Sequence, residues 1–109
     1  MQSRTVIWIL LPALILPVWI LAAEGNAANG KQVFSNRCIV CHGESGEGKE
    51  AIAKAMGATM KPLGSKGVQA LSDENLKKGI VEGRGKMKPL PMSDQDVADV
   101  IAYLRTLKK

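Results

Sequence analysis

The sequence predicts a small all-α domain. No segment alternates apolar and polar residues as a strand would, two serines begin segments with helix-capping patterns, and a later segment carries an apolar stripe at helical spacing. The capping serines are Ser72 and Ser93, and the stripe consists of Val97, Val100, Ile101 and Leu104. A chain of 109 residues has room for one such domain.

The first 23 residues are predicted to be an export signal or a membrane anchor. Arg4 precedes an uncharged apolar run, Thr5 to Ala23, which matches the basic and apolar regions of a secretory signal. The run is also about long enough to cross a bilayer, which takes roughly 17–25 residues, so it could instead remain as a tether. Cleavage could follow Ala23 or Ala27. Whether the run is cleaved or retained, Arg4 stays on the cytoplasmic side. This predicts a periplasmic domain, either soluble or tethered to the inner membrane.

The remaining domain, residues 24–109, needs a stabilising element beyond its own side chains. Phe34 and Tyr103 are its only aromatic residues, and so small a domain buries little apolar surface. Cys38 and Cys41 are separated by two residues, so a disulfide between them would close a tiny loop and stabilise little. A covalently attached cofactor would supply what is missing.

The N-terminal half of this domain is expected to hold two helices joined by a polar loop. The first helix covers residues 29–37 and leads into the cysteine pair. Residues 44–50 are polar and rich in glycine, which favours a loop. A weaker helix is expected over residues 51–55.

The C-terminal half is expected to hold two further helices. One begins at Ser72, where acidic residues in the first turn and lysines later follow the order that the helix dipole favours, and it ends near Gly83. The last begins at Ser93, with Asp96 in the capping-box position.

The most specific motif is the pentapeptide Cys38-Ile39-Val40-Cys41-His42. A Cys-x-x-Cys pair in an exported chain can be a redox dithiol, half of a zinc site or a haem attachment site. Zinc needs four ligands, and the chain adds only one histidine to its two cysteines. No strand pattern precedes the pair, as a thioredoxin-like dithiol would require. Cys-x-x-Cys-His is the attachment signature of c-type haem, so we predict one haem c on Cys38, Cys41 and His42.

The second axial ligand of such an iron must come from another residue type, because His42 is the only histidine. Methionine is the usual partner. Met56 and Met60 lie four residues apart and are interpreted as a packing face. Met87 lies in a loop bracketed by glycines and prolines, which favours it as the ligand. Met92 directly precedes the last helix and fits a hydrophobic staple better, but stays the alternative ligand.

Together these residues resemble the class I cytochromes c, of the short bacterial or cytochrome c6-like kind, over about residues 29–107. Four pieces occur in the family's order: Gly30 to Phe34, Cys38 to Gly43, Gly85 to Pro89, and Ser93 to Leu107. The resemblance implies a small cytochrome c fold, in which helices wrap around one covalently bound haem. It also implies that Gly30, Phe34 and Tyr103 lie where the first and last helices cross.

The chain departs from this family in two places. The family usually has a proline after the motif, and the carbonyl of that proline accepts a hydrogen bond from the ligand histidine. Residues 43–50 contain no proline, so the partner of His42 stays open. Lys88 also stands between Met87 and Pro89, where the family has methionine and proline adjacent.

Positive charge is concentrated around Met87. The formal net charge of +5 falls to +4 without Arg4, and the basic residues nearest to Met87 are Lys77, Lys78, Arg84, Lys86 and Lys88. Two interpretations stay open: an ordinary solvated surface, or a basic rim that steers acidic redox partner proteins. Nucleic acid is not an expected partner of an exported haem protein, and a monomer is expected.

The predicted function is single-electron transfer in an exported respiratory or similar redox chain. With His42 and Met87 in both axial positions, the iron has no open site for a substrate. No catalytic residue is predicted, because no further cluster of ionisable residues suggests acid/base chemistry. The alternative is a haem subunit of an oxidase or dehydrogenase complex, anchored through residues 5–23.

Overall fold

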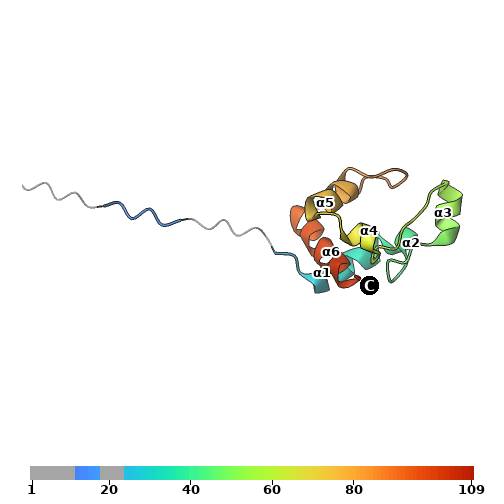
Figure 1. Cartoon of the computed structure of the whole chain (residues 1–109), viewed down its shortest axis with the longest axis horizontal. Coiled ribbons are helices and arrows are strands. Elements are labelled where there is room, and N and C mark those ends of the chain that lie inside the picture. Colours follow the sequence, from blue (N-terminus) through green and yellow to red (C-terminus); the bar gives the residue numbers. More distant parts are fainter. Residues whose placement is uncertain (1–11, 18–23) are drawn as a thin grey trace, which may run out of the picture.

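The computed structural model describes residues 12–17 and 24–109. Its regular secondary structure in this part of the chain is helical, and an isolated bridge between Arg84 and Met87 is the one β feature found there. The helices are α1 (Ala27–Arg37), α2 (Ile39–His42), α3 (Glu50–Met56), α4 (Lys66–Gln69), α5 (Asp73–Val81) and α6 (Asp94–Thr106), and Figure 1 shows their arrangement. The predicted all-α class is confirmed.

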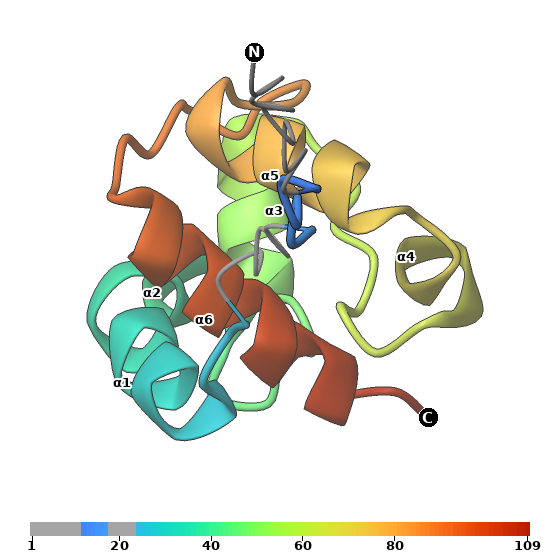
Figure 2. The ribbon, with the colours of Figure 1, turned by 90° about the vertical axis from the view of Figure 1, so that its left-hand side faces the viewer.

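The crossing of α1 and α6 is the best-packed contact between helices (Figure 2). Gly30 makes the close approach possible, because a Cβ atom there would collide with the main-chain carbonyl of Asp99. Phe34 is 1% exposed, and its ring centroid lies 5.2 Å from that of Tyr103. Gly30, Phe34 and Tyr103 therefore meet at the crossing, as the resemblance implied.

A second apolar cluster joins α5 to α6. Leu76, Val97 and Ile101 are buried in it, and Met92 packs against it from just before α6. Ser93 caps α6, with its hydroxyl accepting a hydrogen bond from the main-chain N–H of Asp96 at 3.1 Å. The predicted cap is confirmed, and Met92 occupies the position of a hydrophobic staple.

Ser72 caps α5 in the same way, and its hydroxyl accepts from the N–H of Asn75 at 3.1 Å. The first helix begins two residues earlier than expected. Asn26 is its cap, with the side-chain oxygen accepting from the N–H of Asn29 at 3.0 Å. Asparagine is among the best N-cap residues, so this start could have been recognised from the sequence.

The helix expected over residues 51–55 is observed as α3, whereas the short helix α4 was not expected. Figure 1 shows α3 at the end of the domain farthest from the crossing of α1 and α6. Among the described residues, α3 makes no extensive contact with another helix. Within the described part of the chain, α3 therefore has no helical partner comparable to those of α1, α5 and α6.

The predicted export signal or anchor, residues 1–23, lies outside the described residues except for 12–17, and it stays a prediction. Residues 12–17 have no regular secondary structure and are exposed. Within residues 12–17 and 24–109, no helix is both long enough and apolar enough to span a bilayer.

Candidate functional site

The two cysteines lie on one turn where α1 passes into α2. Cys38 ends the first helix, with its N–H donating to the Phe34 carbonyl at 2.8 Å. The N–H groups of Cys41 and His42 then donate back to the Cys38 carbonyl at 3.3 and 3.0 Å. Burial of Phe34 at the crossing therefore fixes the position of this turn. Both cysteines are half-buried and form no disulfide with each other, and burial raises the pKa of the Cys38 thiol.

His42 closes this turn. Its imidazole is partly buried, and burial lowers its pKa, which favours the neutral form that binds metal ions. The Nδ1 atom is buried and has no hydrogen-bond partner. A histidine that binds a metal through one ring nitrogen usually donates from the other to an oxygen. Among the described residues, no group accepts a hydrogen bond from His42 Nδ1.

The loop after His42 folds back on the turn. The N–H of Gly48 donates to the His42 carbonyl at 2.7 Å, and that of Lys49 donates to the Cys41 carbonyl at 3.0 Å. Met60 lies against Gly48 from the segment that follows α3. The predicted Gly-rich loop is thus ordered by main-chain hydrogen bonds to the cysteine turn.

Met87 is presented by a tight turn that follows α5. Met87 and Arg84 exchange two main-chain hydrogen bonds, of 3.0 and 3.1 Å. Gly85 has a φ of +58° and Lys86 has a negative φ, as in a type II′ turn. The N–H of Leu90 donates to the Ile80 carbonyl at 2.9 Å, which ties the end of the loop to α5. The Met87 side chain is half-buried.

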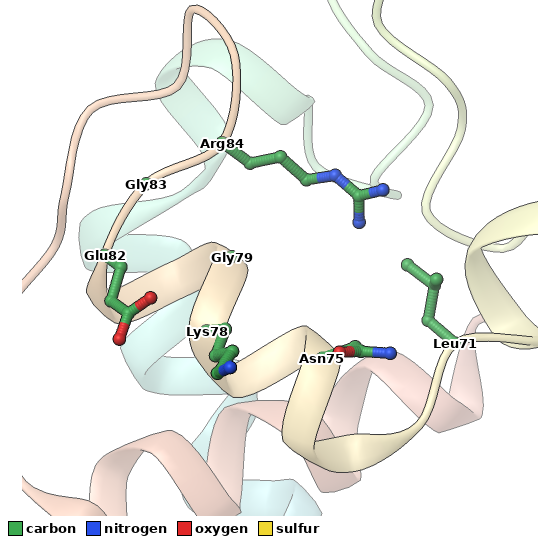
Figure 3. Close-up of a pocket in the computed structure, with 7 residues that line it drawn as sticks. All are labelled: Leu71, Asn75, Lys78, Gly79, Glu82, Gly83 and Arg84. Atoms are coloured by element: carbon green, nitrogen blue, oxygen red, sulfur yellow. The ribbon is translucent and has the colours of Figure 1, made fainter.

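A shallow cavity of about 280 Å³ lies between α5 and this turn. Figure 3 shows Arg84 reaching across it toward Leu71, with Asn75 and Lys78 on the α5 side. The lining carries two cations, Lys78 and Arg84, and one carboxylate, Glu82. Both cations belong to the basic residues near Met87 in the sequence, whereas Asn75 joins them only because α5 brings it to this cavity.

The basic residues around Met87 do not all carry free charge. Lys77 forms an ion pair with Asp94 on α6, with Nζ 3.2 Å from the carboxylate. Among the described residues, Lys78, Arg84, Lys86 and Lys88 are exposed and form no ion pair. Of the five basic residues near Met87, four therefore have no ion pair in the described part of the chain, and the charge of the fifth, Lys77, is paired with Asp94.

The donor set fits haem c rather than a closed metal site. Two free thiols three residues apart and a neutral imidazole on the next residue have the spacing of haem attachment. In the described part of the chain, no group of three or more His, Cys, Asp and Glu side chains converges. The fold and this turn together define a small protein with covalently attached haem.

Comparisons with known proteins define the family. The family model for cytochrome c matches residues 27–108. The chain is 31% identical to cytochrome c-554(547) of Halothiobacillus neapolitanus, over 77% of this chain and 99% of that protein. It is 27% identical to a cytochrome c-553-like protein of Synechocystis, over 81% of this chain and 75% of that protein.

A solved structure, the KustC0563 c-type cytochrome, superposes with a TM-score of 0.63 at 26% identity, over 73% of this chain and 98% of that one. The chain belongs to the cytochrome c family. It is an electron-transfer protein that carries covalently bound haem c with its iron. The resemblance, the fold and the cofactor predicted from the sequence are confirmed.

Proposed function

We propose that this protein is a monohaem single-electron carrier in an exported respiratory or similar redox chain. In the proposal Cys38 and Cys41 form the two thioether bonds, and His42 and Met87 are the axial ligands. The observation that carries it is the presence of two turns held by main-chain hydrogen bonds: the cysteine turn at the end of α1, and the Met87 turn that follows α5. The bound haem supplies an iron that takes up and releases one electron.

The protein's own residues have simple tasks in this function. His42 and Met87 would hold the iron from either side and would leave no open site for a substrate. A histidine and methionine pair also raises the reduction potential of the iron. Main-chain hydrogen bonds hold each turn, so we expect the two turns to move little when the protein gains or loses an electron.

The two methionines of the 83–92 segment provide a matched test of the axial ligand. Met92 packs against the buried cluster around Val97 and sits at the start of α6, whereas Met87 is presented by the turn. The oxidised protein should show the far-red sulfur-to-iron charge-transfer band. Met87→Ala should abolish this band, and Met92→Ala should keep it while lowering stability.

Two results would overturn the assignment. If Met87→Ala kept the band and Met92→Ala lost it, the ligand would be Met92. If the unmodified protein lacked the band and bound carbon monoxide freely, the iron would have an open site, and a carrier would be the wrong proposal.

We also propose that the exposed cations around Met87 attract acidic redox partner proteins. Lys86 and Lys88 flank Met87 directly, and neither forms an ion pair among the described residues. Such charges act mainly on the rate of encounter and are screened by salt. Lys86→Glu with Lys88→Glu should slow oxidation by an anionic reagent such as ferricyanide at low ionic strength and speed oxidation by a cationic cobalt complex.

The same reversal at Lys31 and Lys61, on other parts of the surface, is the matched control. Equal effects from the two pairs would show that only net charge matters and that no directed rim exists.

Export is a further part of the proposal, and it rests on the predicted leader at residues 1–23. In this proposal the mature domain lies in the periplasm, either free or held at the inner membrane by residues 5–23. Cell fractionation with a haem stain tests this. Staining in the osmotic-shock fluid or the membrane fraction is expected, and covalent haem found only in the cytoplasm would contradict export.

A further inference from the structure

The residues just after the apolar run are part of the folded domain. The Glu24 carbonyl accepts a hydrogen bond from the Gln95 side chain on α6, at 3.3 Å. Gly25 lies so close to α6 that a Cβ atom would collide with the Ala98 carbonyl and come within 2.9 Å of the Ala102 side chain. Only glycine fits there without a shift of the main chain.

Asn26 makes the strongest of these contacts. Its side chain caps α1, and its main-chain N–H donates to the Asp99 carboxylate at 2.7 Å. The carboxylate also accepts from the side chains of Asn29 and Gln95, at 2.5 and 2.8 Å. Asp99 is 2% exposed, so each donor matters to a charge that has lost its water.

Two export cuts are open on the sequence, after Ala23 or after Ala27. The usual preference for small residues one and three positions before a cut favours Ala27, because Gly25 is small and Leu21 is not. The contacts in the folded domain instead favour a cut after Ala23. Ala27 is the first residue of α1, so a cut after it removes the cap, the Gly25 contact and one of three donors to Asp99.

We propose that the export peptidase cuts between Ala23 and Glu24, and that Glu24, Gly25 and Asn26 remain as a clasp that holds α1 on α6. This inference rests on the proposed export. A cut after Ala23 keeps all the clasp contacts. A cut after Ala27 would also place the new ammonium group on the first turn of α1, where the helix dipole disfavours positive charge.

The cut is tested by intact-mass measurement of the haem-loaded protein purified after expression of the full-length gene. The proposal expects a chain that begins at Glu24. A chain that begins at Ala28, or one that keeps residues 1–23, would overturn it.

The clasp is tested separately from export. Two haem-loaded proteins are made behind a foreign leader with a defined cut, one beginning at Glu24 and the other at Ala28. The shorter protein should have a thermal midpoint lower by about 4–8 °C, the range expected when a domain of this size loses a helix cap. Equal midpoints would overturn the clasp whatever the natural cut.

A pair of substitutions distinguishes the clasp from a general effect of chain length. Gly25→Leu in the Glu24 protein should lower the midpoint toward that of the shorter protein, because the side chain cannot fit against Ala98. Ala28→Leu, at an exposed position of α1, is the matched control and should leave the midpoint unchanged. If both changes act alike, the contacts of Gly25 do not hold the helix.

Discussion

The two ends of α1 lie in contrasting surroundings. At its N-terminal end and along its middle, α1 packs on α6 around Phe34 and Val100, and the buried carboxylate of Asp99 has three donors. At its C-terminal end it leads to the haem-attachment cysteines, Cys38 and Cys41, and to a buried His42 Nδ1 that has no hydrogen-bond partner among the described residues. The protein thus completes one part of its interior with its own side chains and leaves the other for haem to complete.

The largest effect expected from this contrast follows removal of the haem. Cys38→Ala combined with Cys41→Ala should prevent covalent attachment, and most of the helical circular dichroism should be lost, because so small a domain lacks a sufficient core. Residual amide protection should lie in α1 and α6 rather than in α3 or the Met87 turn. A haem-free chain with full helix content and a cooperative unfolding transition would show that the domain does not need haem to complete its core.

The next largest effect concerns the complete part of the core. Phe34→Ala removes a ring that is 1% exposed and packed on Tyr103, so urea unfolding should show a loss of about 3–5 kcal/mol. Val40→Ala, at a side chain 66% exposed within the haem motif, should change stability by less than about 0.5 kcal/mol. Similar losses at both positions would mean that the crossing is not the dominant core.

Much of this complete part could be predicted from the sequence, because it follows local rules. The caps at Ser72 and Ser93 and the stripe on α6 are set by neighbours in the chain. Asp99 could not be recognised, because its partners Asn26 and Asn29 lie about seventy residues away. Arg105 was missed for the same reason. It joins the main-chain carbonyls of Gln69 and Leu71, at 2.9 and 2.7 Å, to the last helix.

For the haem-binding part of the protein, the sequence predicts the chemistry well and the geometry less well. The five-residue motif identifies haem c because covalent attachment requires those residue types at that spacing. The sequence left the hydrogen-bond partner of His42 open, and the described loop leaves Nδ1 without one. The turn that presents Met87 depends on glycine at position 85, which the loop composition indicated only in general terms.

The contribution of the buried Asp99 carboxylate to stability can be tested by changing the pH. Hydrogen bonds from the Asn26 main chain and the Asn29 and Gln95 side chains lower its pKa below the ordinary value. A carboxyl group with a lowered pKa in the folded state stabilises it above the unfolded pKa of about 3.9, and this contribution is lost as pH falls through the folded value. Asp99→Asn should therefore lower the thermal midpoint at neutral pH.

The gap between Asp99→Asn and the unmodified protein should narrow as pH falls below about 4, because the Asp99 carboxyl group is then protonated first in the unfolded state and, at lower pH, in the folded state as well. Thermal midpoints measured across this range check the prediction. The Asp99→Asn protein should still lose some stability in acid, since main-chain hydrogen bonds also lower the pKa of Glu47. A gap that is constant with pH would mean that the charge on Asp99 contributes nothing and that only its shape matters.

The smallest expected effect concerns Lys77, which links the core to the proposed basic rim. Its ion pair with Asp94 lies on the surface, with side chains 44% and 92% exposed. Lys77→Ala should therefore cost at most about 1 kcal/mol, and less at high salt. Asp94→Asn removes the same pair but frees a cation, so it should speed oxidation by ferricyanide slightly while Lys77→Ala slows it. If the two variants changed that rate in the same direction, Lys77 would act through the packing of α5 on α6, and its charge would not belong to the rim.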